Sequence, residues 1–280
     1  MSTVPSRRLA SGDQIPVIGA GTWDLAGETV KESVRCALDT GYTHVDTAEG
    51  YENETEIGEV LAEYDRDEVF LTSKVLPKHL NYGSVLESCR DSIRRLGVEY
   101  LDLYLIHWPN PAISVRETWN AMERLVEEGY VENIGVSNFS AYQLSAVQHI
   151  ADVPVAVNQI EYNPLYARSE LLEYCRDTDV VVEAAAPFGR GKAFDHRTVR
   201  DVAEKHDRSP AQVALRWAIE KDVVVLPKSS SPDHIRSNFD LFDWELDATD
   251  HEKLDGIEES DPAYDSGARD WTRDTYGIPK

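Results

Sequence analysis

Apolar and polar positions alternate along this chain in two repeating patterns. Short runs rich in β-branched residues are apolar on both faces, which is typical of parallel strands buried between helices. Between these runs, apolar residues recur at the three- and four-residue spacing of amphipathic helices. Strands are predicted at residues 17–21, 42–46, 69–74, 101–107, 131–137, 155–159, 180–185 and 223–227.

Helices are predicted after each of these runs. The expected ranges are 28–40, 55–64, 83–96, 115–128, 141–150, 169–177, 197–205, 210–220 and 233–238, with a last helix after residue 247. Eight strand–helix units in 280 residues predict a (β/α)8 TIM barrel forming a single domain over residues 1–280. Ser11-Gly12-Asp13 predicts a small β-hairpin ahead of the barrel, and the chain ends in an irregular C-terminal tail.

A doubly wound sheet is the alternative fold. It would usually carry a Gly-x-Gly-x-x-Gly turn after an early strand. The nearest candidate begins at Gly19, but Asp24 occupies the position of the third glycine. The barrel is therefore the preferred interpretation.

Ionisable side chains lie at the carboxyl ends of neighbouring predicted strands, which share one mouth in a barrel. Asp46, Lys74 and His107 end the second, third and fourth strands, and Tyr51 follows Asp46 in the same loop. A buried Lys74 needs a partner, and Asp46 is the obvious one. A cation beside Tyr51 would lower the pKa of the phenol and make it a better proton donor. Together these groups could polarise and protonate a carbonyl, although each taken alone is more often structural.

The net charge of the chain limits the kinds of molecule it can bind and indicates the cellular environment in which it works. The net charge of −23 and a pI of about 4.6 argue against binding to nucleic acid. Acidic residues are spread along the sequence, which predicts a salt-loaded cytoplasm and a halophilic archaeal source, with an ordinary acidic enzyme as the alternative. Three cysteines without a Cys-x-x-Cys pair fit a reducing, cytoplasmic compartment. No membrane span and no metal site are expected.

Motifs along essentially the whole chain resemble those of the aldo-keto reductases. The matching segments are Gly21-Thr22-Trp23, Asp46 to Glu54, Ser73-Lys74, Asp102 to Pro109, Gly135 to Phe139, Asn158 to Pro164 and Pro227-Lys228-Ser229. The resemblance implies a (β/α)8 enzyme that uses NADPH, or less often NADH, without a Rossmann fold. It implies that Asp46, Tyr51, Lys74 and His107 are catalytic, with Tyr51 as the general acid.

The resemblance also implies a cofactor site assembled from several loops. Ser137, Asn138 and Gln159 match positions that hold the nicotinamide carboxamide, and Lys228 and Ser229 match positions that grip the adenosine 2′-phosphate. The other expected cofactor contacts are Gly21, Thr22, Trp23, Asp46, Ala185, Pro187, Phe188, Gly189, Arg190, Gly191, Ser230, His234, Arg236 and Asn238. Substrate contacts are expected from Trp23, Tyr51, His107 and Trp108, and from the tail residues Tyr264, Trp271 and Tyr276.

Three positions depart from the family pattern. Ala185 stands where the family has an aromatic residue that stacks on the nicotinamide. His234 replaces an arginine at the phosphate end, with Arg236 as a candidate substitute, because a neutral imidazole cannot clamp a phosphate with two hydrogen bonds. Ser237 stands in place of a glutamate near the adenine amine. These changes predict weaker stacking and a weaker preference for NADPH over NADH.

The leading hypothesis is an NAD(P)H-dependent reductase of aldehydes or ketones, including sugar-derived or keto-acid carbonyls. A second hypothesis is a non-catalytic nucleotide-binding barrel that acts as a sensor or structural partner. A third is a barrel aldolase or isomerase that uses Lys74 as a Schiff-base amine, which pairing with Asp46 disfavours. The expected partner is a small-molecule carbonyl substrate, and the expected oligomeric state is a monomer.

Overall fold

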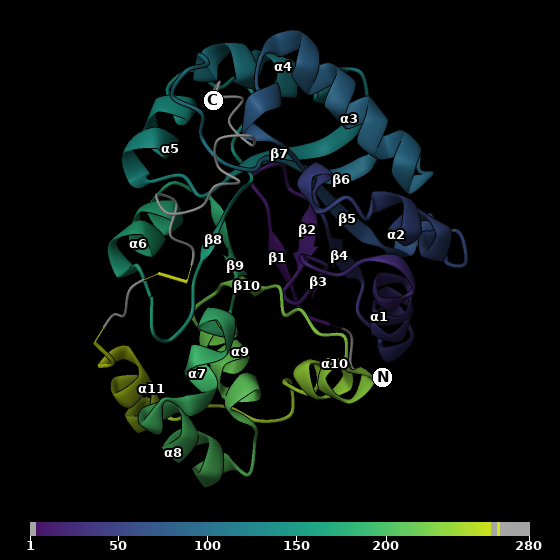
Figure 1. Ribbon diagram of the computed structural model, residues 1–280. Coiled ribbons are helices and arrows are strands. Elements are labelled where there is room, and N and C mark those ends of the chain that lie inside the picture. Colours follow the sequence, from purple (N-terminus) through teal and green to yellow (C-terminus); the bar gives the residue numbers. More distant parts are fainter. Residues whose placement is uncertain (1–3, 259–261, 264–280) are drawn as a thin grey trace, which may run out of the picture.

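The computed structural model describes residues 4–258, 262 and 263, and its centre is an eight-stranded parallel sheet (Figure 1). The strands neighbour one another in chain order from β3 to β10. They are β3 (Ala20–Gly21), β4 (His44–Asp46), β5 (Phe70–Val75), β6 (Leu101–Ile106), β7 (Val131–Ser137), β8 (Val157–Glu161), β9 (Val181–Ala185) and β10 (Val224–Val225).

The two edges of this sheet meet, so the sheet closes into a barrel. Ile18, just before β3, forms a parallel bridge with Val225 of β10. The backbone N–H of Gly19 donates to the carbonyl of Val225 at 2.9 Å, and that of Val225 donates to the carbonyl of Val17 at 2.9 Å. The predicted (β/α)8 fold is therefore confirmed.

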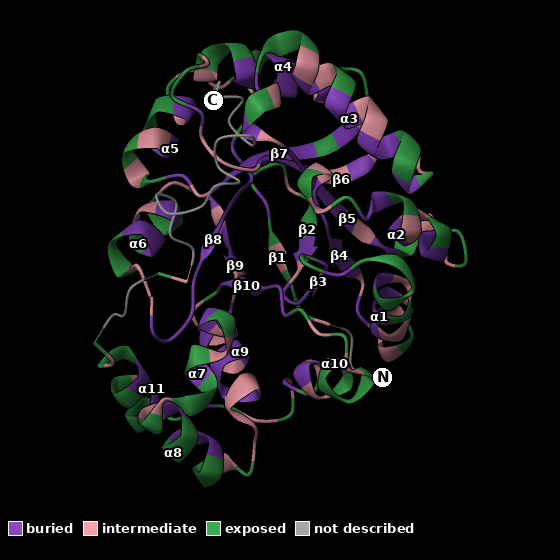
Figure 2. Ribbon diagram, viewed as in Figure 1, coloured by how far each residue is buried: buried purple, intermediate pink, exposed green. Residues whose placement is uncertain are grey.

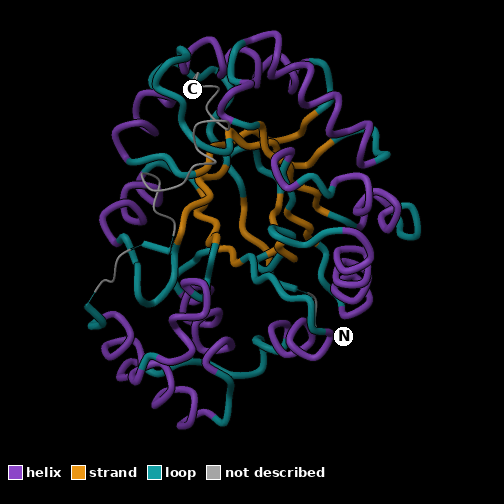
Figure 3. Tube along the Cα trace, in the orientation of Figure 1, coloured by secondary structure: helices purple, strands orange, loops and turns teal. Residues whose placement is uncertain are grey.

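Helices surround the strands on the outside (Figure 3). They are α1 (Gly27–Thr40), α2 (Glu54–Leu61), α3 (Tyr82–Leu96), α4 (Val115–Glu127), α5 (Ala141–Gln148), α6 (Ser169–Asp177), α7 (Lys192–Asp195), α8 (Arg197–His206), α9 (Pro210–Glu220), α10 (Pro232–Phe239) and α11 (Ala248–Asp255). Consecutive helices from α1 to α6 contact each other, and α10 packs against both α1 and α9. The helices thus follow one another around the barrel from α1 to α6, and α10 joins α9 to α1.

Local sequence signals explain where several helices begin and end. At the start of α9, the side chain of Ser209 accepts the N–H of Gln212, and the Gln212 side chain accepts the N–H of Ser209. At the end of α1, Gly41 adopts a φ of 117° and its N–H caps the carbonyls of Ala37 and Leu38. After β9, a 3₁₀ turn, Gly189–Gly191, leads into the short helix α7.

The predicted N-terminal hairpin is confirmed and lies against one end of the barrel. It pairs β1 (Ser6–Arg8) with β2 (Gln14–Pro16) in antiparallel register. Leu9 and Ile15 of the hairpin form an apolar cluster with barrel residues that include Val157 and Val224, which begin β8 and β10. Figure 2 shows the buried residues concentrated on the strands and on the inward faces of the helices. The hairpin therefore covers the amino ends of the strands, and the carboxyl ends stay open to a ligand.

The tail residues Tyr264, Trp271 and Tyr276 lie outside the described residues. Within the part of the chain that is described, no helix combines the length and the apolar character needed to cross a membrane.

Candidate active site

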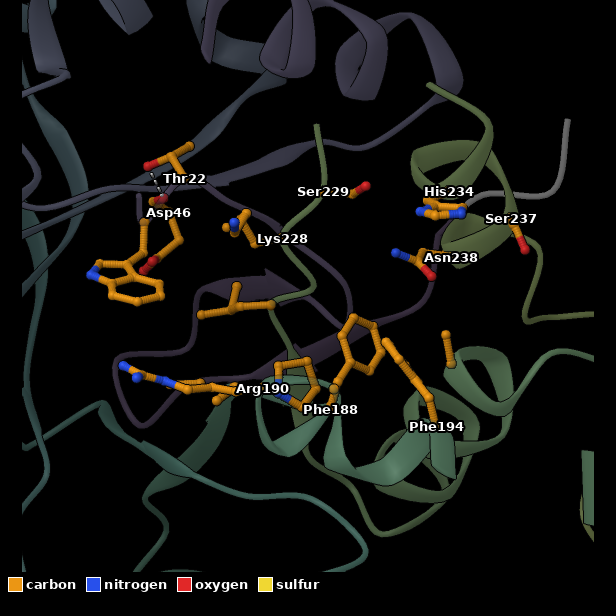
Figure 4. A pocket seen from close by; sticks show the side chains of 18 of the residues that line it. Thr22, Asp46, Phe188, Arg190, Phe194, Lys228, Ser229, His234, Ser237 and Asn238 are labelled. Carbon is orange, nitrogen blue, oxygen red and sulfur yellow. Dashed lines mark hydrogen bonds between the residues drawn. The ribbon is translucent and has the colours of Figure 1, made fainter. Parts of the chain in front are cut away.

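A cleft of about 640 Å³ opens at the carboxyl ends of the strands. Figure 4 shows Thr22 and Asp46 at one end of it and His234, Ser237 and Asn238 at the other, with Lys228 and Ser229 between them. The lining residues are Gly21, Thr22, Trp23, Asp46, Tyr51, Gln159, Ala185, Ala186, Pro187, Phe188, Arg190, Gly191, Phe194, Ser209, Pro210, Ala211, Leu226, Lys228, Ser229, His234, Ser237 and Asn238. Its size suits an organic ligand of substantial length.

A buried ion pair lies under one end of the cleft. The ammonium of Lys74, at the end of β5, donates to both carboxylate oxygens of Asp46, at 2.7 and 2.8 Å. It also donates to the backbone carbonyl of Thr47 at 2.8 Å. Lys74 is fully buried and Asp46 is 4% exposed. Three acceptors thus satisfy the three N–H bonds of the ammonium, as burial of such a group requires.

Tyr51 reaches the same place from the short 3₁₀ helix Glu49–Tyr51, which follows β4. Its hydroxyl lies 3.4 Å from the ammonium of Lys74. The expectation that this cation lowers the pKa of the phenol was wrong. Burial, followed by the negative charge of Asp46, raises the pKa of Tyr51 well above its usual value. The reason is that Asp46 balances the charge of Lys74, so desolvation dominates.

His107 lies beside Tyr51, although it is not among the residues that line the cleft. Its ring meets the ring of Tyr51 edge-on, with centroids 5.6 Å apart. Burial, and then the nearby charge of Lys74, lowers the pKa of His107 to about 3. The imidazole is therefore neutral at physiological pH and keeps one N–H with which to donate a hydrogen bond. Within the described chain its Nδ1 is buried and has no hydrogen-bond partner.

Gln159 forms the floor between Asp46 and a second carboxyl. Its Nε2 donates to Oδ2 of Asp46 at 2.9 Å and to Oε2 of Glu183 at 3.1 Å. Glu183 lies on β9 and is fully buried. Burial, and then the charge of Asp46, raises the pKa of Glu183 to about 8. This residue was missed from the sequence, although a glutamate inside an apolar run is itself a signal.

Some expected cofactor residues lie behind the wall of the cleft. Ser137 ends β7, and the side-chain amide of Asn138 donates to its hydroxyl at 2.9 Å and to the carbonyl of His107 at 3.0 Å. Asn138 adopts a left-handed φ of 63°, which asparagine tolerates better than most residues. Its position therefore ties the ends of β6 and β7 together. Trp108 and Gly189 are also absent from the residues lining the cleft.

The expected phosphate residues lie in the middle and at the far end of the cleft. Lys228 and Ser229 follow β10, and His234 and Asn238 belong to α10. The side chain of Ser231 caps α10 by accepting the N–H of His234. Ser230 and Arg236 are exposed and do not line the cleft.

Arg236 does not meet the expectation that it substitutes for the missing arginine. Its guanidinium pairs with Asp233 one turn earlier in α10, at 3.4 Å. Within α10, His234 is thus the basic residue that lines the cleft.

The long wall of the cleft is apolar and lies after β9. Ala185, Ala186 and Pro187 line it, and Phe188 packs against Phe194 with ring centroids 5.2 Å apart. Ala186 has a φ of 47°, an unfavourable conformation for a residue with a Cβ atom. Ala185 lines the cleft, as expected. Its small side chain offers no ring face at the position where the family has a stacking aromatic residue.

Two residues face each other across the cleft near its mouth. The guanidinium of Arg190 lies 4.8 Å from the ring centroid of Trp23, a cation–π distance. Trp23 is 38% exposed. The loops after β3 and β9 are thus in direct contact.

Several lining residues were not among those expected from the sequence. They are Ala186, Phe194, Ser209, Pro210, Ala211 and Leu226. Most of them come from α7 and from the start of α9, segments with no motif beyond the helix cap at Ser209. In the described chain, no group of three or more His, Cys, Asp or Glu side chains is arranged to hold a metal ion.

Comparisons with known proteins agree with this geometry. Residues 17–259 match the model of the aldo/keto reductase family. A glyoxal reductase of Bacillus subtilis is 38% identical over 253 residues, which cover 89% of this chain and 91% of that protein. The crystal structure of an aldo/keto reductase from Brucella melitensis is 39% identical, with a TM-score of 0.87, and covers 91% of this chain and 100% of the other.

A third relative was solved with a cofactor. It is an aldo-keto reductase of Bombyx mori in complex with NADP, 30% identical to this chain, with a TM-score of 0.89. The match covers 95% of this chain and 96% of that one.

Proposed function

This chain belongs to the aldo/keto reductase family of oxidoreductases, and we propose that it reduces small aldehydes and ketones to alcohols with NADPH, using Tyr51 as the proton donor. The observation that carries the proposal is the position of the Tyr51 hydroxyl. It lies in the cleft, 3.4 Å from the ammonium of Lys74, and its ring contacts that of His107. A proton donor, a cation and a neutral imidazole thus meet at one point.

The NADPH cofactor, when bound, supplies the hydride that the carbonyl carbon receives. Tyr51 gives its proton to the carbonyl oxygen, so that the substrate gains one hydride and one proton. The raised pKa keeps the phenol protonated at neutral pH, so the proton is available. Once the proton has left, the phenolate lies beside the ammonium of Lys74, which stabilises it. Neutral His107 donates a hydrogen bond to the same oxygen and orients it.

The residues of the cleft fit a nicotinamide dinucleotide. Gln159 offers a fixed side-chain amide at one end, where a carboxamide needs a partner. The capped start of α10 lies at the other end, with Lys228 and Ser229 between the two ends, and together they offer the positive charge and donors that a phosphate needs. His234 lacks the planar fork of N–H donors with which an arginine clamps a phosphate. We therefore propose that the protein prefers NADPH to NADH, but by a smaller factor than an arginine at position 234 would give.

The substrate end of the cleft favours small carbonyl compounds. Trp23 and Tyr51 line it, and Ala185 and Ala186 form an apolar wall of the same cleft. The similarity to a glyoxal reductase supports including dicarbonyls among the substrates, beside sugar-derived and keto-acid carbonyls.

The test follows loss of the reduced cofactor's absorbance with a panel of small aldehydes, ketones, dicarbonyls and keto-sugars in molar salt. Tyr51→Phe should lower turnover by about a hundredfold or more, the usual effect of losing a general acid, while cofactor affinity is kept. Tyr142→Phe is a matched control, because Tyr142 is 86% exposed and does not line the cleft. Full activity in Tyr51→Phe would remove Tyr51 from its role.

The other hypotheses gain nothing from the structure. The sensor hypothesis has no feature in its favour beyond the cleft itself, and Lys74 is held by three acceptors rather than free to attack a carbonyl. The relatives named above are from bacteria and an insect and lend no support to a halophilic archaeal source. The single domain, the monomer, the cytoplasmic location and the salt requirement stay predictions.

A further inference from the structure

Glu183 is a buried carboxyl that the proposed reaction does not use. It lies directly beside Gln159, since the two residues pair across β9 and β8. One oxygen, Oε2, accepts from Gln159 at 3.1 Å. The other, Oε1, is 3.8 Å from Nε2 of His44 and has no hydrogen-bond partner in the described chain. An unsatisfied buried carboxyl oxygen is expensive, so its presence calls for an explanation.

Two carboxyl groups hold the side chain of Gln159 in one orientation. Its Nε2 donates to both Asp46 and Glu183, so both of its N–H bonds are used. Turning the amide over would bring Oε1 against two carboxyl oxygens. The side-chain atom left to face the cleft, which Gln159 lines, is therefore the acceptor Oε1.

Among the described residues, the charged groups around Glu183 are few and leave it without a cation in direct contact. Asp46 faces it through Gln159, and the ammonium of Lys74 is bound to Asp46 at 2.7 Å. His44 is fully buried, and burial lowers its pKa to about 3, so it is neutral. Two carboxyls thus share one ammonium, and the group without direct contact to it is the one that takes up a proton.

We propose that Glu183 is a positioning residue for the cofactor, acting through Gln159, and that its ionised form favours the oxidised nicotinamide over the reduced one. The oxidised ring carries a positive charge and the reduced ring is neutral, so a negative charge behind Gln159 distinguishes them. The proposal rests on the proposed function, since it assumes that the nicotinamide end lies at Gln159. Glu183 does not line the cleft and is not itself a catalytic residue.

This arrangement couples binding to proton release. In its protonated form Glu183 is neutral and does not favour either ring. When the positively charged ring binds, the proton should leave, because ionised Glu183 is then stabilised. Affinity for NADP⁺ should therefore rise with pH and level off above about 8, the pKa of Glu183 in the free protein. Affinity for NADPH should show no such rise from this group.

The experiment measures dissociation constants of NADP⁺ and NADPH by protein fluorescence across the neutral and mildly alkaline range. Changes of pH alter phosphate binding equally for the two cofactors, because both carry the same phosphates. Taking the ratio of the two constants therefore cancels this effect. In the natural protein the ratio should shift by about tenfold in favour of NADP⁺ as the pH rises, the size expected for unit charges about 12 Å apart at an effective dielectric constant near 20. In Glu183→Gln the ratio should be constant.

A matched control is Asp102→Asn. Asp102 is a largely buried carboxyl on β6 that pairs with Arg66 at 2.6 Å and does not line the cleft. This variant should keep the pH dependence of the natural protein. If Glu183 had only a packing role, Glu183→Gln would weaken both cofactors equally at every pH, and the inference would be wrong.

Calorimetry on the natural protein gives a second test that needs no variant. Binding of NADP⁺ below pH 8, measured in two buffers of different ionisation enthalpy, should release a fraction of a proton that binding of NADPH does not. Equal proton release for both cofactors would overturn the inference while leaving the proposed function intact. Absence of binding by either cofactor would instead overturn the proposed function.

Discussion

Replacing Asp46 with asparagine tests the ion pair on which the site is built. Both carboxylate oxygens accept from Lys74, and Oδ2 also accepts from Gln159. Whichever atom becomes the nitrogen of asparagine therefore meets an N–H donor. The fully buried ammonium of Lys74 loses the only formal charge in contact with it among the described residues. The change keeps the shape of the side chain, so its effect comes from charge and hydrogen bonding.

The size of the effect follows from the burial of the pair. At an effective dielectric constant of about 20, unit charges about 3 Å apart attract by about 5 kcal/mol. Removing one member of a buried pair usually destabilises a protein by about 3–5 kcal/mol. For 280 residues the entropy of unfolding is about 0.6 kcal/mol per degree, so the melting temperature should fall by about 5–8 °C.

The assay is thermal unfolding followed by circular dichroism, applied to a double-mutant cycle. Lys74→Met removes the cation and keeps an apolar chain of similar length. The double variant should be more stable than the sum of the single changes implies, because neither charge is left alone. Glu63→Gln is the control, since Glu63 pairs with Arg35 on the surface, where water screens the interaction. Strictly additive losses in the double variant would refute the reasoning.

Four further expectations follow. Lys228→Ala should weaken NADPH by about tenfold and NADH much less, measured by fluorescence titration, because only NADPH carries the 2′-phosphate. Ala185→Tyr should tighten NADPH binding by about two- to tenfold in the same titration, the value of a stacking ring. His44, with its pKa lowered to about 3, stays neutral when folded but takes up a proton when unfolded, so stability should fall as pH drops from about 6.5 toward 3, and urea unfolding should show a smaller loss in His44→Gln. Molar salt should raise the melting temperature, because it screens the net charge of −23.

The barrel could be predicted because buried parallel strands leave continuous apolar runs. The runs mark burial rather than hydrogen bonding, however, and this explains why β3 and β10 are much shorter than the runs predicted for them. Val17 and Leu226 are buried, yet they lie outside the bounds of β3 and β10, where the two edges of the sheet meet. By contrast, α6 and α9 have the predicted bounds, and at α9 the reason is the cap formed by Ser209.

The site could be predicted in part. Polar residues at strand ends identified Asp46, Tyr51, Lys74 and His107, which the structure brings together. Glu183 was missed because it lies inside a strand, where only the inward direction of its side chain reveals a neighbour. The direction of the Tyr51 pKa could not be inferred, since it depends on how far burial outweighs a cation that Asp46 already balances.

The hairpin at the closed end of the barrel has a consequence for biosynthesis. Arg7 donates to the carbonyl of Ile219, 212 residues later, and Ser11 donates to Asn133, 122 residues later. A ribosome adds about 5–20 residues per second, so the first of these partners is made roughly ten to forty seconds after the hairpin. The floor of the barrel is therefore among the last parts to form during translation. Until then, Leu9 and Ile15 remain accessible to chaperones and to other nascent chains.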